Sequence, residues 1–65
     1  MYKKIKNINN LYITLGVSYW MNDSNFTPIK VRVLSLDFKY NKVNIGQDWV
    51  GVDLLFKRKN ECPKK

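Results

Sequence analysis

The chain has 65 residues, which is the size of one small domain. It has a single cysteine and no histidine, so neither a disulfide framework nor the four ligands of a structural zinc site are available within one chain. Twelve Lys and Arg residues against five Asp and Glu give a net charge of +7, which favours polyanionic partners such as nucleic acid, acidic proteins or anionic membrane surfaces.

The first ten residues are basic and rich in asparagine. Lys3, Lys4 and Lys6 are followed by three asparagines at positions 7, 9 and 10. These asparagines interrupt the apolar core that a signal peptide requires. No apolar run approaches the roughly 18 residues of a membrane span. We therefore predict a partly mobile basic arm over residues 1–10, able to order as a short strand or turn, on a cytoplasmic protein with no membrane partner.

Residues 11–21 form two runs separated by Gly16. Every second side chain falls on the same face, with Leu11, Ile13 and Leu15 in the first run and Val17, Tyr19 and Met21 in the second. This period-2 spacing is the pattern of a strand. A glycine inside such a pattern marks a bend or a bulge. Residues 22–25 (Asn-Asp-Ser-Asn) are turn formers and predict a hairpin. Pro28 then marks the entry to the next strand.

The segment Ile29–Val33 alternates apolar and basic side chains, which predicts a strand with Lys30 and Arg32 on one face. This central strand is expected to run to about Asp37. Its apolar face switches at Leu34, which indicates a bulge or a bent strand that serves two parts of a barrel.

Two further turns follow the central strand. Residues 39–42 form the first, where Asn41 is suited to a left-handed backbone conformation. Residues 46–48 form the second. The apolar residues after each turn predict two more short strands, over 43–45 and 49–52.

Beyond these strands the chain becomes polar and basic. Asp53 is placed to cap a single helical turn over residues 54–56. The remaining residues, 58–65, are expected to form a polar basic tail. Cys62, within this tail, is expected to be an exposed thiol.

Five short strands, tight turns and one helical turn describe an all-β fold. The sequence has no alanine, the best helix former, while β-branched and aromatic residues are plentiful. We predict a small five-stranded, strongly curved barrel of the Src-homology-3-like or Tudor-like type over residues 11–57, because an oligonucleotide-binding fold typically needs more residues. So small a chain needs large side chains to close its core, and we expect Trp49 and Phe56 there.

The segment Trp49–Lys57 combines a Trp-Val strand, an aspartate-capped turn and a Leu-Phe pair before a lysine-rich tail. Together with Lys42–Ile45 and Leu15–Trp20, it resembles small uncharacterised proteins of phages and other mobile elements. Arg58 stands where such tails usually carry a helix-capping threonine or serine. The resemblance implies a barrel, an origin in a phage or mobile element and a bacterial host cell, and it implies no particular activity.

The sequence contains no pattern typical of an active site. There is no histidine, and the aspartates stand in turn or cap contexts that explain them without chemistry. Three isolated glycines do not make a phosphate-binding loop. We therefore expect a protein that is not an enzyme and that has no cofactor and no metal.

Nucleic-acid binding is one function that the sequence leaves open. Lys30 and Arg32 project from one strand face, and a strong twist of the sheet can bring them to the basic turn and tail. Such a patch neutralises phosphates, and an exposed Tyr40 or Trp20 stacks on unpaired bases. The competing interpretation is a solvated basic face. The candidate residues are Lys30, Arg32, Lys39, Tyr40, Lys42, Lys57, Arg58 and Lys59.

Protein binding is the other function, because small barrels often bind peptides in an aromatic groove between loops. The candidate residues are Tyr19, Trp20, Asp48 and Trp49. Self-association suits either function, since the edge strands of so small a barrel are hard to cover.

We favour a binding module that acts on a host protein or complex, including inhibition of a host defence complex, with nucleic-acid binding as the alternative. Trp20 and Tyr40 beside the face that carries Lys30 and Arg32 would favour nucleic acid. An exposed apolar groove away from the charge would favour a protein partner.

Overall fold

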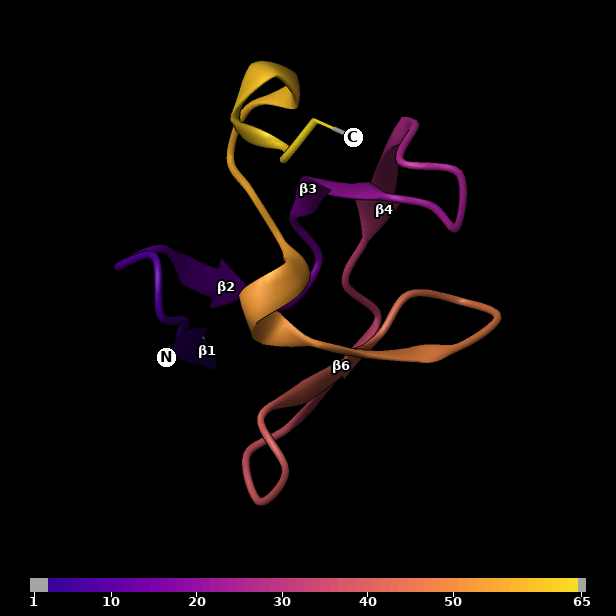
Figure 1. Cartoon of the computed structure of the whole chain (residues 1–65). Coiled ribbons are helices and arrows are strands. Elements are labelled where there is room, and N and C mark those ends of the chain that lie inside the picture. The colour runs from indigo at the N-terminus through magenta and orange to yellow at the C-terminus, as the bar shows by residue number, and fades with distance from the viewer. Residues whose placement is uncertain (1–2, 65) are drawn as a thin grey trace.

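The computed structural model describes residues 3–64, which form short strands and two 3-10 turns and contain no long helix (Figure 1). The strands are β1 (Lys4–Lys6), β2 (Tyr12–Thr14), β3 (Ser18–Asn22), β4 (Pro28–Arg32), β5 (Ser35–Asp37), β6 (Lys42–Asn44) and β7 (Trp49–Gly51). The turns are η1 (Val52–Leu54) and η2 (Lys59–Glu61). Two residues of the predicted arm (1–2) and one of the predicted tail (65) lie outside the described residues.

The strands pair into three small antiparallel sheets, β1–β2, β3–β4 and β5–β6–β7. The predicted five-stranded closed barrel is therefore wrong, although the prediction of a mostly β chain is confirmed. Five of the seven strands have only three residues. Strands this short offer too few ladder positions to pair along the whole edge of a barrel.

The predicted central strand over residues 29–37 is divided in two. β4 pairs with β3, and β5 pairs with β6. Between them, the Val33 N–H donates to the Val17 carbonyl (3.1 Å), and the Leu34 N–H donates to the Asn44 carbonyl (2.8 Å). The chain thus leaves one sheet and enters the next where the apolar face switches in the sequence.

The predicted turns are confirmed. β3 and β4 form a hairpin, and the Asp23 carboxylate accepts hydrogen bonds from the N–H groups of Asn25 (2.8 Å) and Thr27 (2.9 Å) at its tip. Asn41 adopts the left-handed conformation with φ 53°. Gly46, in the turn between β6 and β7, has φ 113°.

The core is aliphatic apart from one tyrosine. Val50 of β7 pairs with the buried Val43 of β6, so the neighbouring Trp49 points to the other face of the strand. Trp49 is 46% exposed and Phe56 is only partly buried, so the prediction that Trp49 closes the core is wrong. The buried cluster consists of Ile5, Ile13, Tyr19, Met21, Val33, Val43, Val52 and Leu55.

η1 lies earlier in the chain than predicted, and Asp53 does not cap it. Gly51 occupies the N-cap position without a side-chain hydrogen bond. The Asp53 carboxylate instead accepts a hydrogen bond from the Ile8 N–H (2.8 Å), 45 residues away. The Asp53 carboxylate therefore binds a distant main-chain N–H group, and not an N–H group of the helical turn that the sequence predicted.

Asn7 attaches the β1–β2 hairpin to η1. Its side chain is buried, and Nδ2 donates to the carbonyls of Val52 (2.9 Å) and Leu55 (3.1 Å). Its Oδ1 accepts hydrogen bonds from the N–H groups of Asn9 (3.0 Å) and Leu11 (3.1 Å). One side chain therefore holds both the turn of the hairpin and its contact with the core.

The C-terminal segment folds back beside β3. Phe56 pairs with Trp20 of that strand, and the Asn22 side chain donates to the Pro63 carbonyl (2.6 Å). Cys62 is only 5% exposed, so the expected exposed thiol is wrong. None of the helical segments among residues 3–64 has the length and apolar character to cross a membrane.

Candidate nucleic-acid interface

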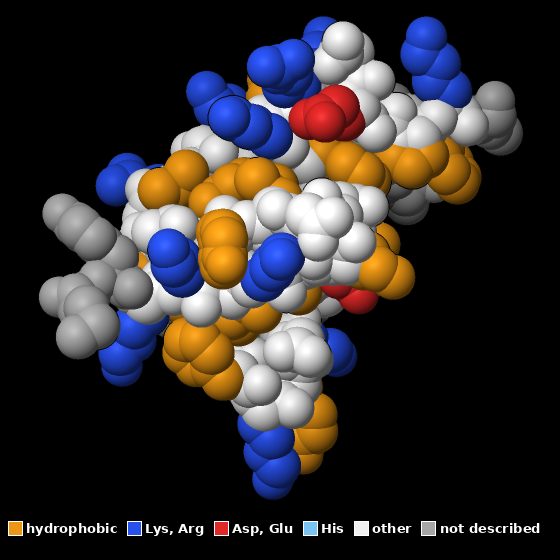
Figure 2. Space-filling view, turned by 90° about the vertical axis from the view of Figure 1, so that its left-hand side faces the viewer, with side chains coloured by type: hydrophobic (Ala, Val, Ile, Leu, Met, Phe, Trp, Pro, Cys, Tyr) orange, Lys and Arg blue, Asp and Glu red, His pale blue; other side chains and the backbone are white. Residues whose placement is uncertain are grey.

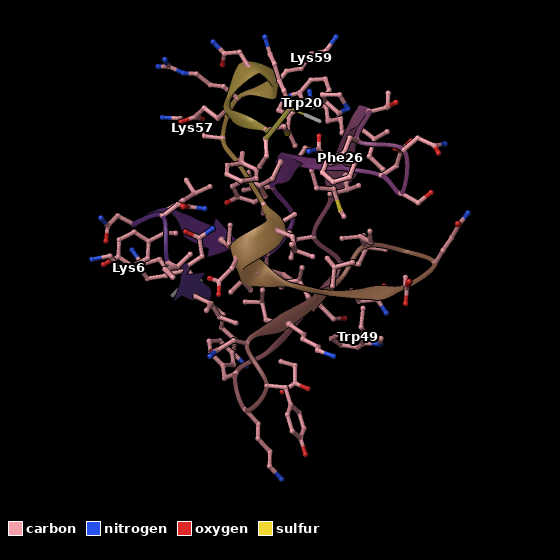
Figure 3. The ribbon with its side chains drawn as sticks, in the orientation of Figure 1. Lys6, Trp20, Phe26, Trp49, Lys57 and Lys59 are labelled. Atoms are coloured by element: carbon pink, nitrogen blue, oxygen red, sulfur yellow. The ribbon has the colours of Figure 1, made fainter. Side chains whose placement is uncertain are left out.

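Trp20 lies on the outer face of β3, directly opposite Lys30 of β4. Its neighbours in the strand, Tyr19 and Met21, point into the core, so Trp20 points outward and is partly buried. The Nζ of Lys59 lies 5.8 Å from the centroid of the indole ring. Figure 3 shows Lys59 beside Trp20 at the end of the molecule where the C-terminal segment folds. The ring thus has a basic residue across the sheet and another above it.

Two further contacts complete this surface, which we call the Trp20 face (Trp20, Lys30, Arg32 and Lys59). Arg32 is two residues from Lys30 and shares its side of β4. The Nε of Arg32 donates to the Gly16 carbonyl (3.2 Å), which fixes the guanidinium against the bend between β2 and β3. In η2 the Glu61 carboxylate accepts a hydrogen bond from the Arg58 N–H (2.9 Å), and this closes the turn on which Lys59 lies.

The basic turn between β5 and β6 is separate from the Trp20 face. The Nζ of Lys39 lies 5.4 Å from the ring of Tyr40, which is 65% exposed, and Lys42 begins β6 close by. This turn lies at the opposite end of the molecule from the C-terminal segment (Figure 1). The predicted joining of strand face, turn and tail into one patch therefore does not occur.

Lys57 is also directed away from Trp20. Figure 3 shows it on the side of the molecule that carries Lys6. It lines a groove of about 290 Å³ together with residues of the β1–β2 turn, Asn9 and Asn10 among them. Of the three consecutive basic residues of the tail, Lys59 alone is in contact with the Trp20 ring.

The four predicted protein-binding residues do not form one groove. Tyr19 is buried, and its hydroxyl donates to the Tyr12 carbonyl (2.9 Å) and accepts from the Thr14 N–H (2.8 Å). Trp20 lies on the opposite face of the same strand. Trp49 lies far from Trp20 in Figure 3, and the main-chain N–H of Trp49 donates to the Asp48 carboxylate (2.9 Å).

The structure also brings together a cluster that the sequence interpretation did not include. Tyr12 of β2 is 49% exposed, and the Nζ atoms of Lys4 and Lys6 in β1 lie 4.4 and 5.9 Å from the centroid of its ring. Figure 2 shows basic side chains on both sides of an apolar one over this hairpin. The period-2 spacing of Lys4 and Lys6 was a signal for this cluster, but the pairing with Tyr12 depends on the register of the hairpin.

An apolar groove lies at the tip of the β3–β4 hairpin. It has a volume of about 320 Å³ and is lined by Phe26, Leu54, Phe56 and Pro63, with Asp23 and Asp53 among the other lining residues. Phe26 is 50% exposed and has φ 59°, a left-handed conformation that is rare for a bulky side chain. The sequence predicted the hairpin turn but not that an aromatic residue would occupy its strained position.

The acidic side chains are used within the fold. Each of them accepts at least one hydrogen bond from a main-chain N–H, and they are Asp23, Asp37, Asp48, Asp53 and Glu61. Among residues 3–64, no Lys or Arg nitrogen lies within 4.0 Å of a carboxylate oxygen.

No known protein family, curated protein or solved structure matches this chain. Within residues 3–64, no group of three His, Cys, Asp or Glu side chains is placed to hold a metal ion. Burial raises the pKa of the Cys62 thiol, and the neighbouring Glu61 carboxylate raises it further.

Proposed function

We propose that this protein is a non-enzymatic module that binds single-stranded nucleic acid through its Trp20 face. The main support is the position of Trp20, which lies across the sheet from Lys30 and has the ammonium of Lys59 5.8 Å from its ring. An aromatic side chain among basic ones is the combination with which proteins hold unpaired bases and the phosphates between them.

The distribution of charge supports the same function. The net charge is +7, and all five carboxylates accept main-chain hydrogen bonds. In the free protein the Lys59 ammonium is attracted to the face of the indole. A base that stacks on Trp20 takes this position, and Lys59 moves to an adjacent phosphate. Lys30 and Arg32 neutralise the phosphates on the other side of the base.

The two tryptophans provide a direct test with a built-in control. In a Trp49→Phe variant the fluorescence reports Trp20 alone, and in a Trp20→Phe variant it reports Trp49 alone. We expect a single-stranded oligonucleotide to quench Trp20 and to leave Trp49 unchanged. A duplex should quench Trp20 less, because its bases are already stacked and only its phosphates are available. Equal quenching of both tryptophans, or of neither, would contradict the proposal.

Charge variants separate the Trp20 face from general attraction by a basic protein. Lys30→Gln/Lys59→Gln and Lys39→Gln/Lys42→Gln each remove two positive charges, at opposite ends of the molecule. For single strands the logarithm of affinity falls by about 0.7 per neutralised phosphate for each tenfold rise in salt. We expect the first pair to reduce this salt slope by about 1.4 and the second to leave it nearly unchanged. Equal losses would indicate non-specific attraction.

We propose protein binding as a second candidate function, supported by the strained Phe26. A bulky side chain in the left-handed region costs roughly 1–3 kcal/mol, and such strain concentrates at functional sites. The half-exposed ring lines an apolar groove that also contains Asp23 and Asp53. A host protein segment with an apolar side chain next to a basic one fits this groove, and binding would take place in the cytoplasm of a bacterial cell.

Selection from a random peptide library tests this second function. Peptides enriched on the wild-type protein should contain the apolar–basic pair and should bind a Phe26→Asn variant at least about tenfold more weakly, as expected for an aromatic anchor worth more than 1.4 kcal/mol. Enriched peptides that bind the variant equally well would exclude this groove as the docking site.

We further propose that the fold is an opened arrangement of the Src-homology-3-like type. The order of pairing supports this: β3 pairs with β4, the chain bends into β5–β6–β7, and after η1 it returns to β3 at Phe56. An experimental structure with this pairing order would support the assignment. A different order would exclude it.

A further inference from the structure

The β1–β2 hairpin presents a second aromatic ring among basic side chains. Tyr12 is 49% exposed, directly opposite Lys6 in the ladder, with the Nζ of Lys4 only 4.4 Å from its ring centroid. Lys3 lies beside this cluster in sequence, and its carbonyl accepts a hydrogen bond from the Leu15 N–H (3.3 Å), which extends the hairpin by one step. The ring is therefore held on a paired strand rather than on a free arm.

A groove lies between the turn of this hairpin and the C-terminal segment. It is lined by Asn9, Asn10 and Leu11 of the hairpin and by Leu55, Phe56, Lys57 and the acidic Glu61 of the C-terminal segment. Phe56 is the residue that pairs with Trp20 through its main chain. Figure 2 shows further Lys and Arg side chains above the hairpin, in the direction of the C-terminal segment. The groove thus lies between the hairpin that carries Tyr12 and the segment that carries Lys59.

We propose that the Tyr12 cluster (Tyr12, Lys4 and Lys6) is a second base-stacking site and that one single strand of nucleic acid occupies both Tyr12 and Trp20. The inference rests on the proposed function of the Trp20 face. A base stacks on Tyr12, and the ammonium groups of Lys4 and Lys6 move from the ring to the flanking phosphates. The strand continues along the groove, where Lys57 contacts a phosphate, toward Trp20.

The test is designed so that the fold is preserved. The hydrogen bond between Tyr12 and the buried Tyr19 hydroxyl uses the Tyr12 main-chain carbonyl, which every substitution keeps. Tyr12→Leu removes the ring and keeps an apolar side chain, whereas Tyr12→Phe keeps the ring and removes the hydroxyl. All variants are made in the Trp49→Phe background, so that fluorescence reports Trp20. Circular dichroism and urea unfolding confirm that each variant folds.

Two lengths of oligothymidylate separate the two sites. An oligomer of about 16 nucleotides is long enough for both rings, and one of about 4 nucleotides fills only one. With the long oligomer we expect Tyr12→Leu to bind about 5- to 150-fold more weakly than the wild type, the range expected for one lost stacking contact, and Tyr12→Phe to bind normally. With the short oligomer, quenching of Trp20 should be the same in all three proteins.

The charge variant gives an independent measurement. Lys4→Gln/Lys6→Gln should reduce the salt slope for the long oligomer by about 1.4, as expected for two phosphates. If the wild type binds the long oligomer and Tyr12→Leu binds it equally well, the Tyr12 site is wrong and the Trp20 proposal stands. If the short oligomer is weakened as much as the long one, the two rings do not act as separate stacking sites, and the two-site inference is wrong. If neither oligomer quenches Trp20 in the parent Trp49→Phe protein, the proposed function itself fails.

Discussion

Trp20 and Phe56 exchange both of their main-chain hydrogen bonds, with the Trp20 N–H 2.8 Å from the Phe56 carbonyl and the Phe56 N–H 2.7 Å from the Trp20 carbonyl. This single bridge adds the C-terminal segment to the free edge of β3, while β4 occupies the other edge. It also places η2 next to the Trp20 ring, which is how Lys59 reaches the candidate site.

The bridge can be tested with a proline. Phe56→Pro removes the N–H that donates to Trp20, whereas Phe56→Leu keeps it and loses a similar part of the apolar contact. We expect the free energy of unfolding to be about 1–3 kcal/mol lower for the proline variant than for the leucine variant, because a partly buried carbonyl loses its donor. Urea unfolding of the two variants measures the difference. Equal stabilities would mean that the bridge contributes nothing.

The bend between β2 and β3 depends on the left-handed conformation of Gly16, which has φ 83°. A Cβ at Gly16 or at Gly51 would meet no atom within 4 Å, but Gly51 has an ordinary φ of −67°. Gly16→Ala should therefore lower the free energy of unfolding by about 1–2 kcal/mol. Gly51→Ala should leave it unchanged or raise it by up to about 1 kcal/mol. A Gly16→Ala variant as stable as Gly51→Ala would contradict this account.

Asn7 should be among the least replaceable polar residues of the described chain. It is 5% exposed, and its side chain makes four hydrogen bonds, two within the β1–β2 turn and two that join this turn to Val52 and Leu55. Asn7→Ala leaves these groups without partners and should lower the free energy of unfolding by about 3 kcal/mol. Asn9→Ala, at an exposed neighbouring position, is the matched control and should change it by less than about 0.5 kcal/mol. Chemical unfolding of both variants provides the comparison.

Phe26 should be replaceable without loss of stability. Asparagine tolerates φ 59° far better than phenylalanine does, and the ring is half exposed, so little apolar burial is lost. We expect the free energy of unfolding of Phe26→Asn to equal or exceed that of the wild type by up to about 1 kcal/mol. A clear decrease in thermal or urea unfolding would show that the packing of the ring outweighs the backbone strain.

Cys62 should make stability fall at alkaline pH. Burial raises the pKa of its thiol above the ordinary value of 9.0, and Glu61 adds to the effect. As the pH rises through 9.0 the unfolded chain loses this proton before the folded one does, so the unfolded state gains relative stability. The stability advantage of the wild type over Cys62→Ala should therefore shrink between about pH 8 and about pH 10. An advantage that is constant or that grows would contradict the assignment.

The local features of this protein can be predicted from its residues and their near neighbours in the chain. Period-2 alternation predicted the β3 and β4 strands and placed Lys30 and Arg32 on the outer face of β4, because successive side chains in a strand alternate between faces. The turn formers after β3 and the left-handed Asn41 were equally clear, because these preferences depend on the residue and its immediate neighbours.

The contacts between distant segments, in contrast, depend on the complete fold. The hydrogen bond from Ile8 to Asp53, the return of Phe56 to Trp20 and the burial of Cys62 all join segments far apart in the chain. In a small chain with three-residue strands, no ladder is long enough to specify closure from its own pattern. The exposure of Trp49 and the position of Lys59 over Trp20 follow from these long-range contacts, and no local preference contains them.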